Sequence, residues 1–94
     1  MATVTVRIPT PLRSFTGGAN EVMVDGATAG EAIQALIGIH DGLGERILTP
    51  DGGLRNFVNL YVGGQDIRNL EGLRTAVSDG DILSIVPAVA GGQL

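Results

Sequence analysis

The stretch GDILSIVPAVAGG, residues 80–92, joins a strand to a tail of small side chains. Ile82–Pro87 is rich in aliphatic residues and ends in a proline, which predicts a central strand with a defined end. Beyond this strand the side chains shrink to the pair Gly91 and Gly92. Taken alone, such a pair is more often a frayed end than a chemical handle, so its meaning depends on the rest of the chain.

The length and composition allow one folded domain. The 94 residues leave no room for two cores, and an apolar fraction of 44% suffices for one compact aliphatic core. We therefore expect a domain over residues 1–87 and a flexible tail over residues 88–94. In that tail, Gln93 and Leu94 extend the chain past the glycines.

The composition also excludes several kinds of chemistry. With no cysteine and a single histidine, His40, the chain offers neither a nucleophilic thiol nor a typical zinc site, so no metal site is expected. The net charge of −4 argues against nucleic-acid binding. No apolar run approaches the roughly 20 residues of a membrane span, and no signal-peptide pattern opens the chain. We expect a cytoplasmic protein that is not itself an enzyme, because no catalytic nucleophile–base pair is present.

Two strands and a helix are predicted in the first half. Thr3–Ile8 and Glu21–Asp25 indicate strands, and the loop between them, with Pro9 and Pro11, suggests an antiparallel hairpin with an open tip. DGATAGEAIQALIGIH, residues 25–40, contains the helix.

The helix has both a start signal and a stop signal. Thr28 and Glu31 have the spacing of a capping box, and Gly42 is a plausible C-terminal stop. One apolar stripe with helical spacing is formed by Ala29, Ala32, Ile33, Leu36, Ile37 and His40.

A second hairpin dominates the other half. Residues 57–62 alternate as a strand, Gly63 and Gly64 form a tight turn, and Gln65–Arg68 return. Single helical turns are expected near Arg46–Leu48 and within LEGLRTAVSDGD. The predicted order is strand, strand, helix, strand, strand, loop, strand.

This order, with a last strand that runs into AGG, resembles the ubiquitin-like β-grasp carriers of the ThiS/MoaD family, and most of all the mycobacterial-type sulfur carrier of cysteine synthesis. The matching stretches are VTVRIPTPLRSFTGG, FVNLYVGGQDIRNLEGL, VSDGD and ILSIVPAVAGG. The resemblance implies an α+β fold with a mixed sheet of about four to five strands and one main helix packed on one face. The first and last strands would be adjacent and parallel at the centre of that sheet.

The resemblance also implies a function for Gly92. In such carriers an E1-like enzyme uses ATP to adenylate the last glycine, and sulfur attack then gives a thiocarboxylate. The carrier is a protein co-substrate with no bound cofactor, and it donates sulfur to an acceptor such as a cysteine synthase or an enzyme of specialised metabolism. Ala90 and Gly91 would enter the partner's narrow channel, where a residue without Cβ passes and others clash.

The end of the chain departs from the family pattern. Carriers that are ready to act stop at the second glycine, whereas Gln93 and Leu94 follow Gly92 here. By analogy with the family, we expect a precursor that a zinc-dependent metallopeptidase of the JAMM type cuts between Gly92 and Gln93.

A docking surface is expected on the folded body. Ordering a tail of a few residues costs on the order of 5–10 kcal/mol, so the body should dock first. Two alternating pairs on the predicted strand are candidates, Phe57 with Tyr61 or Leu60 with Val62, and alternation alone does not say which pair faces outward.

Three other functions remain open. The chain could be the small subunit of molybdopterin synthase, or a ubiquitin-like protein modifier conjugated through Gly92, or a β-grasp binding module with an inert tail. The absence of lysine prevents chains of the protein itself but leaves other targets available.

Overall fold

The computed structural model describes residues 2–56 and 58–87. Its strands are β1 (Ala2–Arg7), β2 (Glu21–Gly26), β3 (Val58–Val62), β4 (Gln65–Asp66) and β5 (Ile82–Pro87). Its helices are α1 (Ala29–Ile39), the single turn α2 (Gly44–Ile47) and the 3-10 helices η1 (Thr10–Thr16), η2 (Ile67–Asn69) and η3 (Gly72–Arg74). The predicted order of the strands and the main helix is confirmed.

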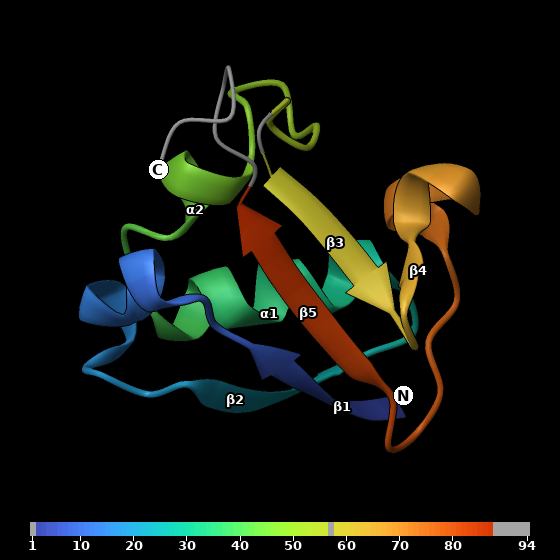
Figure 1. The fold of residues 1–94 in the computed structure, drawn as a ribbon, viewed down its shortest axis with the longest axis horizontal. Coiled ribbons are helices and arrows are strands. Elements are labelled where there is room, and N and C mark those ends of the chain that lie inside the picture. The colour runs from blue at the N-terminus through green and yellow to red at the C-terminus, as the bar shows by residue number, and fades with distance from the viewer. Residues whose placement is uncertain (1, 57, 88–94) are drawn as a thin grey trace.

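The strands form one mixed sheet in the order β2-β1-β5-β3-β4. β1 and β5 pair in parallel at its centre, with Val6 beside Leu83, whereas the other neighbouring strands are antiparallel. Figure 1 shows α1 crossing one face of this sheet. The structure therefore has the predicted α+β, ubiquitin-like β-grasp arrangement.

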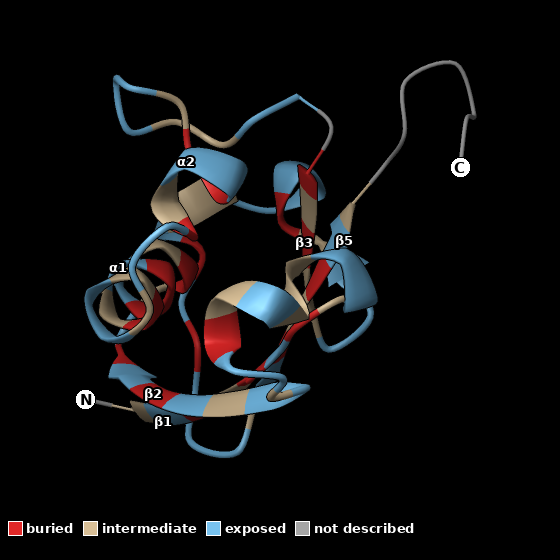
Figure 2. Cartoon of the chain, turned by 90° about the vertical axis from the view of Figure 1, so that its left-hand side faces the viewer, coloured by how far each residue is buried: buried red, intermediate tan, exposed pale blue. Residues whose placement is uncertain are grey.

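The hydrophobic core lies between α1 and the sheet, where the buried residues gather in Figure 2. The largest fully buried side chains are Ile8, Ile33, Leu36, Leu43, Ile47, Leu60, Ile67, Leu83, Val4 and Val6. Burying each of the larger ones contributes on the order of 1.5–3 kcal/mol. None of the helices in the described parts of the chain is long and apolar enough to cross a membrane.

The predicted capping box starts α1. Oγ1 of Thr28 accepts a hydrogen bond from the N–H of Glu31 at 3.1 Å, and Oε1 of Glu31 accepts one from the N–H of Ala27 at 2.8 Å. The first bond satisfies an N–H of the first helical turn, as predicted. The second reaches the residue before the N-cap, whereas in a standard capping box it reaches the N–H of the N-cap itself. The helix then packs closely on the end of β2, since a Cβ at Gly26 would lie 2.7 Å from the nitrogen of Ala32.

The connection between β1 and β2 differs from the open loop expected. It contains η1, with Pro9 at its N-cap and Pro11 in its first turn. A proline fits there because the first turn needs no N–H from it and its fixed φ suits a helix. The helix ends at Gly17, whose φ of 65° lies in the left-handed region. The two prolines thus end one element and start another.

The tight turn between β3 and β4 is as predicted. Gly63 and Gly64 have φ values of 59° and 88°, which glycine adopts without strain. Positive φ at both central residues matches the twist of a two-residue hairpin.

Candidate functional site

β5 carries the chain to the tail. Pro87 ends this strand and is the last residue described. The residues predicted for adenylation, tail insertion and cleavage are Ala90, Gly91, Gly92 and Gln93, and all four lie outside the described residues. Phe57 lies outside them as well. The structure places the surface from which the tail starts, and we call Pro87 and its strand partner Val58 the tail root.

Arg68 holds the β3 side of the tail root. The carbonyl of Val58 accepts a hydrogen bond from Nη2 of Arg68 at 2.9 Å. Nη2 also donates to the carbonyl of Arg55 at 3.0 Å, and Nη1 donates to Oδ1 of Asn59. One guanidinium therefore ties the beginning of β3 to the loop before it. No local pattern of residues signals this contact, because Arg68 and its acceptors belong to different elements.

The sheet face turned away from α1, here called the open face, carries a polar row. Glu21, Arg7, Ser84 and Tyr61 are successive partners across β2, β1, β5 and β3. Nε of Arg7 lies 3.4 Å from Oε2 of Glu21. Both side chains are about half exposed, so this ion pair adds little to stability.

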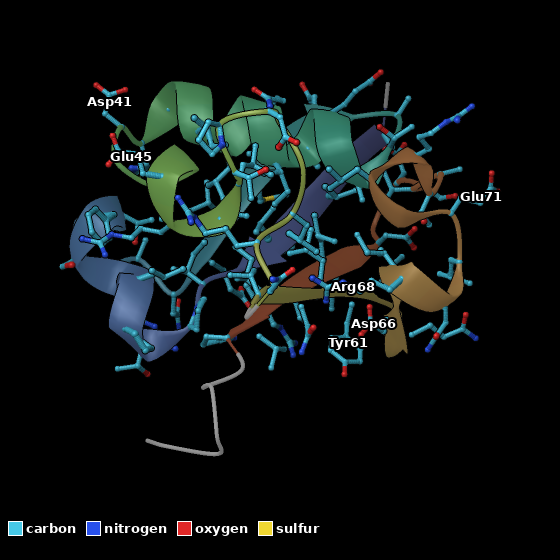
Figure 3. The ribbon with its side chains drawn as sticks, turned by 90° about the horizontal axis from the view of Figure 1, so that it is seen from above. Asp41, Glu45, Tyr61, Asp66, Arg68 and Glu71 are labelled. Carbon is cyan, nitrogen blue, oxygen red and sulfur yellow. The ribbon has the colours of Figure 1, made fainter. Side chains whose placement is uncertain are left out.

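An apolar patch lies beside that row. Ile82 and Val86 of β5 are 37% and 41% exposed, and Met23 of β2 is 67% exposed. Tyr61 points away from α1 on the same side of the sheet (Figure 3). Together with Gly63, Gly64, Arg7 and Ser84, the residues Tyr61, Ile82 and Val86 line a shallow hollow of about 490 Å³. We call Tyr61, Ile82 and Val86 the open-face patch.

The structure decides which side of β3 faces outward. Leu60 is fully buried, and Val62 is half-buried against the same core. Leu60 therefore has no exposed surface that a partner could contact, and its assignment to a docking surface is wrong. The reason is register: Leu60 pairs with the buried Ile85, whereas Tyr61 pairs with Ser84 on the open face. That the face carrying Tyr61 docks a partner stays a prediction.

His40 and Asp79 have structural roles. The N–H of His40 caps α1 by donating to the carbonyl of Leu36 at 2.9 Å. Oδ1 of Asp79 accepts from the N–H of Thr3 at 2.7 Å, in the turn before β5. In the described parts of the chain, no group of three or more histidine or acidic side chains is placed to hold a metal ion.

Comparisons with known proteins agree with this geometry. The model of the ThiS family matches residues 6–92. Sulfur carrier protein CysO of Mycobacterium tuberculosis is 48% identical over 91 residues, which cover 95% of this chain and 98% of that protein. A chain in the crystal structure of the Amycolatopsis orientalis BexX/CysO complex is 46% identical, with a TM-score of 0.88 over 95% of this chain and 99% of that chain.

A relative of another kind is also similar. Small archaeal modifier protein 3 of Haloferax volcanii is 40% identical over 68 residues, which cover 72% of this chain and 73% of that protein. The family match spans nearly the whole sequence, and the solved structures share the fold. The chain therefore belongs to the ThiS family.

Proposed function

We propose that this protein is a sulfur carrier whose reactive group is the carboxylate of Gly92. The observation that carries the proposal is the family match, which runs through residue 92 and leaves Gln93 and Leu94 outside it. Identity of 48% to the sulfur carrier CysO over nearly the full length supports the same function.

The chemistry needs a terminal carboxylate and no side chain. In an E1-like enzyme, a carboxylate oxygen of Gly92 attacks the α-phosphorus of ATP, pyrophosphate leaves, and an acyl-adenylate forms. Hydrosulfide, delivered by a sulfur donor, then attacks the carbonyl carbon and AMP leaves, which gives the thiocarboxylate. The carrier is the co-substrate and the partner enzymes supply catalysis, so a chain without cysteine can take part in sulfur chemistry.

The thiocarboxylate sulfur is a nucleophile, so its acceptor must present an electrophilic carbon. A cysteine synthase acting on an activated serine derivative fits this requirement, and so does an enzyme of specialised metabolism. A similar carrier has been crystallised in the BexX/CysO complex, which supports direct docking on a partner protein.

Docking through the open face follows from the energetics of the tail. Ordering a few tail residues costs on the order of 5–10 kcal/mol, and glycines have no side chains to offset that cost. The open-face patch offers apolar area on the central strand β5, which leads directly to the tail. Burying Ile82 and Val86 against a partner would recover part of the ordering cost.

Residues after Gly92 block this chemistry. The carboxylate then belongs to a later residue, and the side chains of Gln93 and Leu94 would have to enter a channel suited to glycine. A JAMM-type metallopeptidase that cuts between Gly92 and Gln93 would expose the required group. Cleavage would thus control sulfur loading.

Pyrophosphate exchange tests the proposal. A chain ending at Gly92 should support ATP–pyrophosphate exchange by the E1-like enzyme of the same genome, and the chain that includes Gln93 and Leu94 should not. Intact mass of protein from the native host should show a chain ending at Gly92, as carboxylate or thiocarboxylate. Equal exchange by both forms would contradict control by cleavage, and exchange by neither would contradict the carrier function.

The similarity to small archaeal modifier protein 3 favours a second candidate, a protein modifier joined to target amines through Gly92. The same acyl-adenylate would then be attacked by a lysine amine of the target. Immunoblots of the host should in that case show higher-mass conjugates that resist thiols and disappear when Gly92 is deleted. A sulfur carrier alone would give no such conjugates.

A further inference from the structure

Two arginines lie beside the tail root. Arg46 of α2 and Arg55, in the loop before β3, line one hollow of about 300 Å³ that extends to Val58. Val58 is the strand partner of Pro87, from which the tail starts. The whole protein has a net charge of −4, yet two cationic side chains lie together beside the tail root.

Both guanidinium groups are positioned by contacts that leave their ends free for a ligand. Nε of Arg55 donates to the carbonyl of Glu45 at 2.6 Å. The guanidinium of Arg46 lies over the ring of Phe15, 5.2 Å from its centroid. Within residues 2–56 and 58–87, the one ion pair joins Arg7 and Glu21, so neither Arg46 nor Arg55 has a carboxylate partner there.

The acidic residues nearby, Asp51 and Glu45, form no ion pair with these arginines. The carboxylate of Asp51 accepts hydrogen bonds from Oγ1 of Thr49 and from the N–H of Gly53. Glu45 lines an adjoining hollow with both arginines but lies beyond ion-pair distance of them. The two carboxylates match the two arginines in number of charges, but neither lies within ion-pair distance of Arg46 or Arg55, so both guanidinium groups keep N–H donors for a ligand. A planar guanidinium with parallel N–H donors is suited to bind carboxylates in a bidentate manner.

We propose that Arg46 and Arg55 form a docking site for carboxylate side chains of the E1-like adenylating enzyme, at the mouth of the channel that receives the tail. This inference rests on the proposed function, because only then does the tail enter such a channel. The site lies at the edge of the docked surface and is exposed to solvent. Charges in that position act mainly on the association rate and its salt dependence rather than on dissociation.

Binding kinetics on the immobilised adenylating enzyme test the site. At low salt, the double variant R46Q/R55Q should associate roughly tenfold more slowly than the wild type and dissociate at a similar rate. Its association rate should also depend less on salt. The control is Arg74→Gln in η3, which can be compared with Arg55→Gln because each removes one positive charge. Arg74→Gln should change the rate less than about twofold.

Several results would overturn the inference. If R46Q/R55Q associates like the wild type, or if Arg74→Gln slows binding as much as Arg55→Gln, the pair is not a specific site. If the wild type itself fails to bind the adenylating enzyme, the proposed function is wrong too. If the wild type and R46Q/R55Q both bind normally, only the arginine site is wrong. Chemical-shift changes at Arg46 and Arg55 with magnesium-ATP alone would assign the pair to phosphate and overturn the carboxylate assignment.

Lysine variants separate charge from local structure. Glutamine at these positions removes the Nε bond of Arg55 and the ring contact of Arg46, so loss of binding could reflect a displaced loop. R46K/R55K keeps both charges and should keep the association rate within about threefold of the wild type. If the lysine variant binds as slowly as the glutamine variant while both melt at the wild-type temperature, recognition by charge is wrong.

Discussion

Val58 of β3 is the antiparallel partner of Pro87, and this pair marks the place where the sheet ends and the tail begins. Backbone groups of successive residues in a strand point to opposite sides, and the carbonyl of Val58 points away from β5. On that side it accepts a hydrogen bond from Nη2 of Arg68 at 2.9 Å. Arg68 lies in η2, so this bond ties the beginning of β3 to the segment that follows β4. The strand that pairs with the end of β5 is thus held from its other side.

Replacing Arg68 should loosen the tail root. Arg68→Gln removes donors to the carbonyls of Arg55 and Val58 and to Asn59, and we expect the free energy of unfolding to fall by about 1–2 kcal/mol. Amide hydrogen exchange should become faster at the beginning of β3 before it changes elsewhere. Arg74→Gln is the control, since no side-chain hydrogen bond to Arg74 occurs in the described residues. Unchanged exchange around Val58 would show that the bonds of Arg68 do not hold this strand.

Shortening Leu60 should affect stability and leave docking intact. Leu60 is fully buried beneath α1, so Leu60→Ala should reduce the free energy of unfolding by about 2–5 kcal/mol through lost transfer energy and a cavity. Leu70→Ala makes the same change at a side chain that is 42% exposed, and it should cost less than about 1 kcal/mol. Denaturant titrations measure both. Under conditions where Leu60→Ala is fully folded, weaker binding to the adenylating enzyme would contradict the assignment of Leu60 to the core.

Local signals in the sequence predicted most of the fold. The N-cap of Thr28, the pair Gly63 and Gly64, and the proline that ends β5 each depend on a few neighbouring residues. These features can therefore be predicted from the sequence before the tertiary structure is known. η1 differs from the expected open loop because Pro11, besides ending a strand, also suits the first turn of a helix.

The site was less predictable because it depends on pairing between distant segments. Alternation in β3 divides its residues into two sets, but which set faces α1 is decided by the register with β5, which buries Leu60 and turns Tyr61 to the open face. The approach of Arg46 to Arg55, and of both to the tail root, follows from the path of the loop before β3. No periodicity in the sequence encodes that path.

Removing the helix cap should cost a modest and specific amount. Thr28→Ala deletes the oxygen that accepts from the N–H of Glu31, and we expect a loss of about 1 kcal/mol in the free energy of unfolding. Thr28→Ser keeps an acceptor at the same place, and its free energy of unfolding should fall by no more than a few tenths of a kcal/mol. Equal losses for alanine and serine would mean that the methyl group, rather than the hydrogen bond, matters at this position.

Making the open-face patch polar should weaken docking without unfolding the domain. Ile82 and Val86 are 37% and 41% exposed, so each would bury only part of a full side chain against a partner, which is worth about 1 kcal/mol. The double variant I82T/V86T keeps β-branched side chains suited to a strand, and its dissociation constant for the adenylating enzyme should rise roughly thirtyfold. Ile39→Thr, at a residue of α1 that is 59% exposed, is the matched control and should bind like the wild type. Calorimetry measures binding, and thermal melting checks the fold. If the double variant melts normally and binds with unchanged affinity, the carrier docks through another surface.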